Sequence, residues 1–219
     1  MIIYWIFIVL LSLPKTIYVN FRSLPFLQAI KMPLLIHYNT KLSSLSGIVL
    51  FTNPPKLFSV KFGFTGSFAL GGVNYWSNSG KMVFNGKASF ARGTQIVCGD
   101  KATLCFGANF SSNSNCIFNA GKKVVFGDNC LLSWNISVLD GDGHKLIEPL
   151  SSKGLEDENQ IIIGNHVWIC MNSMILKGTL IKDNSVIGAG SIVSRKQEEP
   201  NLLIVGVNKV IKKQINWVQ

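Results

Sequence analysis

The chain has 219 residues, of which 47% are hydrophobic, and a formal net charge of +10. A chain of this length and composition can bury a sizeable core, which excludes an intrinsically disordered protein. Its five cysteines are an odd number without closely spaced pairs. This excludes a disulfide framework and predicts free thiols in a reducing, cytoplasmic compartment.

The positive charge is concentrated in the first half of the sequence. Residues 1–99 contain no Asp or Glu, whereas nine Lys and Arg residues lie among residues 1–92. This pattern indicates either attraction to an anionic partner, such as a lipid headgroup surface, an acidic glycan or a phosphorylated cofactor, or a basic face that simply meets water. Nucleic acid is not expected as a partner, because the basic residues are scattered singly and form no known binding motif.

Residues 1–13, MIIYWIFIVLLSL, are almost wholly apolar. Pro14 and Lys15 end this run well short of the roughly 20 residues that a membrane-spanning helix needs. The run also lacks the basic start and the small-residue cleavage site of a signal peptide. Two interpretations remain: an anchor that lies in the cytoplasmic leaflet of the cell membrane, or a helix packed on the body of the protein or on a neighbouring subunit.

Residues 1–60 as a whole are expected to form an apolar, basic segment and a cap.

A repeat becomes clear from Ile163, where the sequence divides into five successive hexads, IGNHVW, ICMNSM, ILKGTL, IKDNSV and IGAGSI. A period of six fits neither an amphipathic helix nor a simple alternating strand. It is the signature of an all-β fold, the parallel β-helix, with three six-residue sides in each coil.

The residue types within the hexads suit such a coil. The leading Ile is expected to point into the prism and to stack on its counterpart one coil away, where β-branched bulk is favoured. The fifth residue, small or β-branched in every hexad, is expected near a corner. The same phase recurs upstream from Phe84, with Phe more often than Ile inside and with Cys116 and Cys130 at the fifth place, where packed thiols are expected.

The predicted β-helix domain, residues 61–219, contains an inserted loop and a tail. Residues 145–162 break the hexads and hold four of the chain's eleven acidic residues. A loop of this length without repeats is more often functional than idle. The tail, residues 200–219, is expected to form a final strand followed by a short basic helix.

The stretch DGDGHKL, residues 140–146, precedes this loop and raises the question of a metal site. An EF-hand loop that began at Asp140 would need an oxygen ligand at position 5, a glycine at position 6 and a carboxylate at position 12. The sequence has His144, Lys145 and Ser151 at these positions, so a calcium loop is excluded. A three-histidine zinc site is excluded as well, since His37 lies outside the repeat and leaves only His144 and His166. No metal is expected.

The residues FGDNCLLSWNISVLDGDGHKL and the hexads that follow, as far as GAGSIVSRK, resemble the hexapeptide-repeat acyltransferases. Within that family they are most similar to the sugar O-acetyltransferases of bacterial polysaccharide gene clusters. The likeness covers residues 84–212. It implies a left-handed parallel β-helix, a homotrimer, and acetyl-CoA bound as co-substrate in the groove between adjacent subunits.

The resemblance implies a catalytic and acceptor site around His144, which matches the family's catalytic histidine. Neutral imidazole can take the proton of a sugar hydroxyl as its oxygen attacks a thioester. Asp142 points to the same side in an extended segment, where it either orients the ring or is a turn carboxylate in water. Asn113 aligns with an acceptor-pocket asparagine, and its amide or a backbone N–H would meet the oxyanion. Trp134 is expected to wall the acceptor site, since sugars stack on indole.

The resemblance also implies a cofactor site. Trp168 matches the indole beside the cofactor and acceptor groove, and Ala189 a position whose backbone contacts the pantetheine arm. Ser194 and Arg195 fall near the adenine and phosphate end of the cofactor. The chain departs from the family at Met171, which replaces a small residue that often touches the cofactor, and in the ending GVNKVI, which lacks the family's proline.

The sequence thus predicts an acetyl-CoA-dependent O-acetyltransferase of a polysaccharide or lipid-linked glycan, in the cytoplasm or at the inner face of the cell membrane. Two alternatives stay open: N-acetylation of an amino sugar, and a non-catalytic β-helix that serves as a scaffold or glycan-binding module. A sugar nucleotidyltransferase is not expected, because residues 1–60 are too short for its separate glycine-rich domain.

Overall fold

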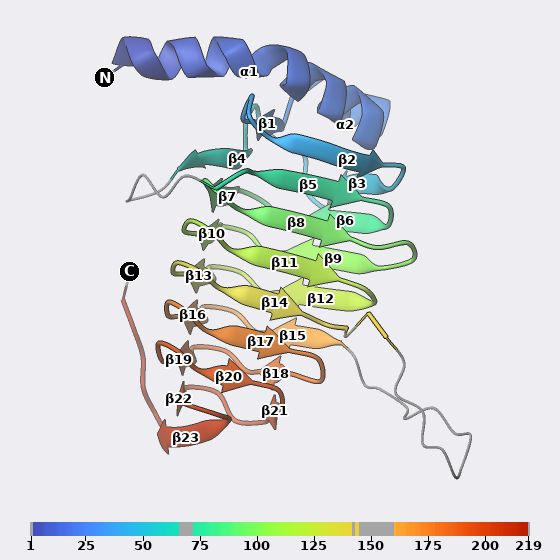
Figure 1. Ribbon diagram of the computed structural model, residues 1–219. Helices are drawn as coiled ribbons and strands as arrows, with labels where there is room; N and C mark the ends of the chain where they lie inside the picture. Colours follow the sequence, from blue (N-terminus) through green and yellow to red (C-terminus); the bar gives the residue numbers. More distant parts are fainter. Residues whose placement is uncertain (1, 66–71, 142, 145–159, 219) are drawn as a thin grey trace, which may run out of the picture.

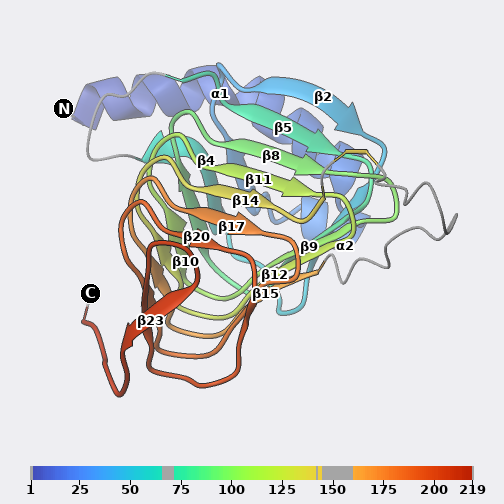
Figure 2. The same ribbon diagram turned by 60° about the horizontal axis from the view of Figure 1, so that its bottom comes forward.

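The chain folds as a left-handed parallel β-helix, which confirms the predicted fold class. The computed structural model describes residues 2–65, 72–141, 143–144 and 160–218. Helices α1 (Ile2–Ser23) and α2 (Phe26–Ala29) lie across one end of the stacked coils (Figure 1). Viewed nearer to the coil axis, the stack has the outline of a triangular prism (Figure 2).

The described strands form three sheets, here called A, B and C in the order in which each coil visits them. Sheet A contains β1 (Leu34–Ile36), β4 (Val60–Thr65), β7 (Ala88–Ala91), β10 (Phe110–Ser112), β13 (Leu131–Leu132), β16 (Trp168–Ile169), β19 (Val186–Ile187), β22 (Leu203–Val205) and β23 (Lys209–Lys212). Sheet B contains β2 (Lys41–Leu45), β5 (Tyr75–Asn78), β8 (Gln95–Cys98), β11 (Ile117–Ala120), β14 (Ser137–Leu139), β17 (Met174–Leu176) and β20 (Ile192–Val193). Sheet C contains β3 (Ile48–Phe51), β6 (Lys81–Phe84), β9 (Thr103–Phe106), β12 (Lys123–Phe126), β15 (Ile161–Ile163), β18 (Leu180–Ile181) and β21 (Lys196–Gln197).

The hexads explain why the chain winds in this way. The leading residue of every hexad from Ile163 to Val193 is at most 1% exposed. Each pairs with its counterpart one coil away, as Ile163 does with Ile181. Burying a side chain of this size stabilises a fold by about 1.5–3 kcal/mol, so the interior columns hold the coils in register. The residues at the fifth place are buried as well: Val167, Ser173, Thr179, Ser185 and Ser191.

Upstream of the loop, phenylalanine takes the place of isoleucine in the core. In sheet C the rings of Phe84 and Phe106 stack at 5.4 Å, and those of Phe106 and Phe126 at 5.7 Å. Cys116 and Cys130 are buried at the fifth place, which confirms the expected packed thiols. The interior columns of stacked side chains therefore continue upstream of the loop, with phenylalanine in place of isoleucine.

The coils turn at three corners, here called the first (sheet A to B), the second (B to C) and the third (C to A). Asparagines in the left-handed backbone conformation make many of these bends, such as Asn135 and Asn172 at the first corner, with φ of 57° and 58°. Asparagine adopts this conformation more readily than other non-glycine residues. The side-chain Nδ2 of Asn135 also donates to Asn172 Oδ1 at 3.0 Å, so hydrogen bonds link successive turns along this corner.

The coil begins upstream of the boundary expected at residue 61. Strands β1, β2 and β3 form a complete first coil over residues 34–51, and β3 pairs in parallel with β6. The segment between β3 and β4, which contains Pro54 and Pro55, interrupts the six-residue phase. Because of this interruption, the six-residue period alone does not predict the first coil.

Helix α1 is longer than the apolar run predicted, because it continues through Pro14 to Ser23. By length and composition alone, Tyr4–Ser23 is long and apolar enough to cross a membrane, which corrects the expectation that the run is too short. The same helix packs on β1. Ser12 Oγ accepts from the Tyr38 amide at 3.0 Å and Thr16 Oγ1 from the Ile36 amide at 3.0 Å, so contacts on both sides of Pro14 hold the helix.

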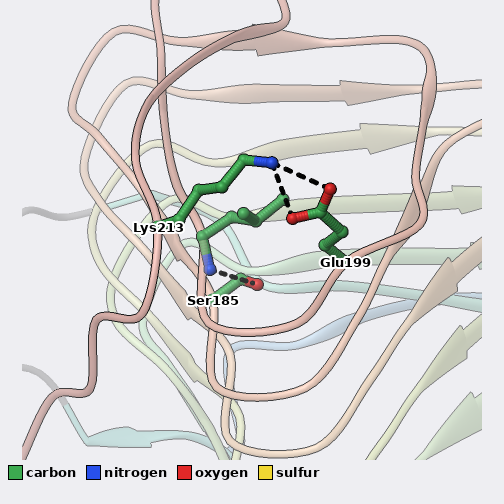
Figure 3. Close-up of polar contacts among 4 residues, drawn as sticks. Ser185, Glu199 and Lys213 are labelled. Carbon is green, nitrogen blue, oxygen red and sulfur yellow. Dashed lines mark hydrogen bonds and ion pairs between the residues drawn. The ribbon is translucent and has the colours of Figure 1, made fainter.

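The tail forms a strand in place of the expected basic helix. Strand β23 runs antiparallel to β22, after a turn in which Gly206 and Asn208 have φ of 57° and 55°. The turn and the β-branched pair Val210–Ile211 favour a hairpin over a helix, and β22 offers an open sheet edge. Beyond the hairpin, Lys213 donates to Glu199 Oε1 at 2.8 Å (Figure 3). The backbone amide of Leu202, just before β22, donates to Ser185 Oγ at 3.2 Å.

Candidate active site

One group of predicted site residues forms a column along the first corner. Asn113, Trp134, Met171 and Ala189 follow β10, β13, β16 and β19, which are consecutive strands of sheet A. Backbone hydrogen bonds join the turns of this column: the Asn172 amide donates to Trp134 O at 3.0 Å, and the Gly190 amide to Met171 O at 2.9 Å. The structure therefore brings these four positions together.

The first-corner column faces solvent. The Met171 side chain is 43% exposed and Ala189 is also exposed, while Asn113 and Trp134 are half-buried. The small side chain at Ala189 leaves the backbone of this turn accessible. The column thus offers an amide, an indole, a thioether and open backbone along one edge of the prism.

A second group lies at the second corner. His144 follows β14 and is exposed, while Ser194 and Arg195 follow β20 on the same side of sheet B. The Ser194 amide donates to Asn208 Oδ1 at 2.8 Å, which ties this turn to the C-terminal hairpin. Arg195 is exposed and therefore free to turn its guanidinium outwards.

The segment that carries His144 is anchored by a carboxylate whose role the sequence did not reveal. Asp140 is fully buried, and its two oxygens accept from the amides of Gly121, Lys122 and Lys123 at 2.5, 2.9 and 2.6 Å. These donors belong to the turn at the same corner one coil earlier. Asp140 therefore fixes the point from which the chain leaves the coil, four residues before His144.

Beyond Asp140 the chain turns outwards. Gly143 has φ of 73° with nothing within 4 Å of the place that a Cβ would occupy. Asp142 and residues 145–159 lie outside the described residues, so the expected pairing of Asp142 with His144 stays a prediction.

The two groups lie at opposite ends of sheet B. A strand rises about 3.3 Å per residue, so a six-residue side separates the first and second corners by about 15–20 Å. A base and its reacting atoms must approach to about 3 Å. Within one chain His144 therefore lies too far from the first-corner column for both to contact one reacting atom.

Trp168 lies on the outer face of sheet A, and a tryptophan from the tail packs against it. Trp168 Nε1 donates to Ser133 Oγ at 3.2 Å, toward the first corner. On its other side lies Trp217, whose ring centroid is 5.9 Å from that of Trp168. The Trp217 ring also stacks on His166 at 4.2 Å and its Nε1 donates to His166 O at 2.8 Å. No spacing in the sequence indicated this cluster, because 51 residues separate His166 from Trp217.

Cysteine is not suited to act as a nucleophile here. Burial raises the pKa of Cys98 to about 11 and that of Cys116 and Cys130 to about 12. Burial also raises the pKa of Cys170, which lies at the first corner. Because the thiolate is the reactive form, these thiols stay protonated and inert near neutral pH. Within the described ranges, no three His, Cys, Asp or Glu side chains gather in a way that could hold a metal ion.

Part of the chain is similar to known proteins. Residues 160–195 match the family model described as bacterial transferase hexapeptide (six repeats). This part of the chain therefore carries the hexapeptide repeat that the model describes. The matched residues contain Trp168, Met171, Ala189, Ser194 and Arg195, whereas His144 lies upstream of them.

Curated relatives of this chain include O-acetyltransferases. The chain is 40% identical over 115 residues to the galactoside O-acetyltransferase of Escherichia coli (strain K12), which covers 52% of this chain and 56% of that protein. It is 28% identical over 111 residues to the galactoside O-acetyltransferase of Lactococcus lactis subsp. lactis (strain IL1403), or 51% of this chain and 53% of that protein. It is 28% identical over 130 residues to the polysialic acid O-acetyltransferase of Escherichia coli O1:K1 / APEC, or 58% of this chain and 39% of that protein. The chain thus spans about half the length of the curated relatives that it matches.

Proposed function

We propose that this chain, which carries a transferase hexapeptide repeat, is an acetyl-CoA-dependent O-acetyltransferase that acts on a sugar hydroxyl of a polysaccharide or a lipid-linked glycan. Three curated relatives are O-acetyltransferases by name, two of galactosides and one of polysialic acid, which supports the class of acceptor. The observation that carries the proposal is the exposed His144, held by the Asp140 anchor at one corner of the same prism whose other corner carries the first-corner column.

The separation of the two corners supports an oligomer with shared sites. In a cyclic trimer whose axis runs parallel to the coil axis, residues of neighbouring copies meet at equal heights along the stack. His144 and Trp134 flank the same strand, β14, and therefore lie at the same height. His144 of one copy would face Trp134 and Met171 of the next, with acetyl-CoA between them.

In this reaction the His144 imidazole takes the proton of the acceptor hydroxyl as the sugar oxygen attacks the thioester carbon. The tetrahedral intermediate carries its negative charge on the former carbonyl oxygen, which a backbone N–H or the Asn113 amide meets. Its collapse breaks the carbon–sulfur bond, and the imidazolium returns the proton to the CoA thiolate. The products are the acetylated sugar and free CoA. Ser194 and Arg195 would hold the phosphate end of the cofactor.

Replacing His144 by Ala tests the proposal. We expect the rate of acetyl transfer to fall about 10²–10⁴-fold, because a general base contributes that much, while the exposed position leaves the fold intact. CoA release with galactosides and acidic glycans as acceptors measures the rate, and circular dichroism checks the fold. Asp100→Ala, an exposed change at the same corner, serves as the matched control.

Retained turnover in His144→Ala, with Asp100→Ala also active, would show that another group acts as base. Loss of the acetyl group from the product in mild alkali distinguishes an ester from the amide that N-acetylation would give. Failure of the wild-type chain to bind any acyl-CoA would favour a non-catalytic β-helix.

A further inference from the structure

Helix α1 exposes most of its large apolar side chains and buries three of its polar ones. Its buried side carries a row of polar side chains: Ser12, Thr16 and Asn20, spaced four residues apart, are each 0% exposed and lie on the same side as the buried Ile8 and Val19. Its outer side is apolar and, with α2, forms what we call the cap face, a set of large side chains that are 42–73% exposed: Tyr4, Trp5, Ile6, Phe7, Leu10, Leu11, Ile17, Tyr18, Phe21, Phe26, Leu27 and Ile30. A soluble surface helix shows the reverse arrangement.

The polar side of α1 has a structural reason, because it covers the open edge of β1. Asn20 Nδ2 donates to Leu34 O at 2.8 Å and Asn20 Oδ1 accepts from the Leu34 amide at 3.1 Å. Lys15 Nζ donates to Tyr38 O at 2.5 Å and to Thr40 O at 2.6 Å. The helix lies across the end of the prism (Figure 1), and these bonds hold it there with its exposed apolar side chains outwards.

The chemistry of the cap face points to a lipid surface. Large exposed apolar patches mark interaction sites. Tyr4, Trp5 and Tyr18 are side chains of the kind enriched at membrane interfaces, where an apolar ring and a polar tip meet both phases. Arg22 and Lys31 are exposed at the far end of the cap, and residues 1–99 contain no acidic residue that would repel an anionic headgroup.

A basic cavity opens beneath the N-terminal part of α1 and continues along the sheet A side of the prism as far as β10. It has a volume of about 610 Å³ and combines an apolar lining from Trp5, Leu57 and Phe58 with three lysines, Lys56, Lys61 and Lys87. Lys61 Nζ lies 5.9 Å from the centre of the Trp5 ring. Ammonium groups beside an apolar floor suit the phosphate and the glycerol backbone of an anionic phospholipid.

We propose that the cap face docks flat on an anionic lipid bilayer, with the cavity beneath Trp5 taking a phospholipid headgroup and the coil axis standing along the membrane normal. Interfacial helices bind through buried apolar area together with attraction to anionic lipids, and this end of the molecule supplies both. The proposal does not rest on the acetyl-transfer activity.

Vesicle flotation of the full chain tests the apolar part of this surface. We expect the wild-type chain to float with vesicles of phosphatidylcholine and phosphatidylglycerol, and the combined change Phe7→Ser, Leu11→Ser and Tyr18→Ser to lower the bound fraction about tenfold or more. The matched control, Val207→Ser with Ile211→Ser, removes exposed apolar side chains at the other end of the prism and should bind like the wild type.

A second set of variants tests the charges. The combined change Lys56→Gln, Lys61→Gln and Lys87→Gln should reduce binding to phosphatidylglycerol vesicles to the level seen with phosphatidylcholine alone, as high salt should for the wild type. Lys182→Gln, Lys209→Gln and Lys212→Gln, all exposed and far along the coil, should leave the preference unchanged.

Three outcomes would overturn the proposal. The first is a wild-type chain that does not bind phosphatidylglycerol vesicles, and the second is an apolar triple variant that binds as well as the wild type. The third is a triple variant that changes the oligomeric state without lipid and keeps vesicle binding, because the cap face would then be an interface between copies of the chain.

Discussion

At the scale of single residues, the DGDGHKL stretch contains two residues in different environments, the buried Asp140 and the exposed His144. The sequence placed it in the DGDGHKL stretch with His144, and the structure buries it against three amides of the preceding coil. Its partners lie 17–19 residues earlier, so no local spacing reveals them. The exposed His144, by contrast, could be singled out from the sequence because the motif resembles a family motif.

Replacing Asp140 by Ala should destabilise the fold and slow the reaction together. Three backbone N–H groups lose a carboxylate, and hydrogen bonds to a charged group contribute about 1.5–3 kcal/mol, so we expect a loss of at least this size in the free energy of unfolding. Urea denaturation measures the loss and CoA release measures the rate. Asp100→Ala is the control, and equal stability of the two variants would show that Asp140 is not an anchor.

At the scale of elements, the repeating part of the fold could be predicted and its ends could not. The leading Ile and the small fifth residue recur every six positions, so the sequence alone is enough to predict the coil from Phe84 to Val193. The ends depend on contacts between distant segments. Helix α1 continues through Pro14 because Ser12 and Thr16 bind β1 and the chain after it, and β23 forms because β22 leaves an edge to pair with.

The role of α1 as an edge cover leads to a specific prediction for Asn20. Asn20→Ala leaves the amide and the carbonyl of Leu34 without their side-chain partner under a covered edge, which should cost about 1–3 kcal/mol of unfolding free energy. Amide hydrogen exchange at Leu34 should accelerate accordingly. Ile17→Ala, on the exposed side of the same helix, should change neither quantity by more than about 0.5 kcal/mol. Similar effects of the two changes would refute the edge-covering role.

At the scale of the whole molecule, the two proposals together orient the prism, with its α1 end on the bilayer and the acetyl-transfer site farther along the coil axis. Strand β14 lies four steps from β2 in sheet B. At about 4.8 Å per step this places His144 about 19 Å from the first coil, and the helical layer adds about 10 Å. A docked molecule would then present its site about 30 Å above the headgroups. Such a height suits a glycan that extends from its lipid better than a sugar at the membrane surface.

The central claim is that one acetyl-transfer site combines His144 of one copy with the first-corner column of another. Mixing two inactive variants tests it most directly: His144→Ala, and Ala189→Trp, which fills the exposed first corner. In randomly mixed trimers about a quarter of the sites, one half times one half, would combine an intact His144 with an intact column. We predict that co-expressed variants regain about a quarter of the wild-type rate of CoA release per site. A mixture as inactive as either variant alone, with mixed trimers present, would contradict the claim.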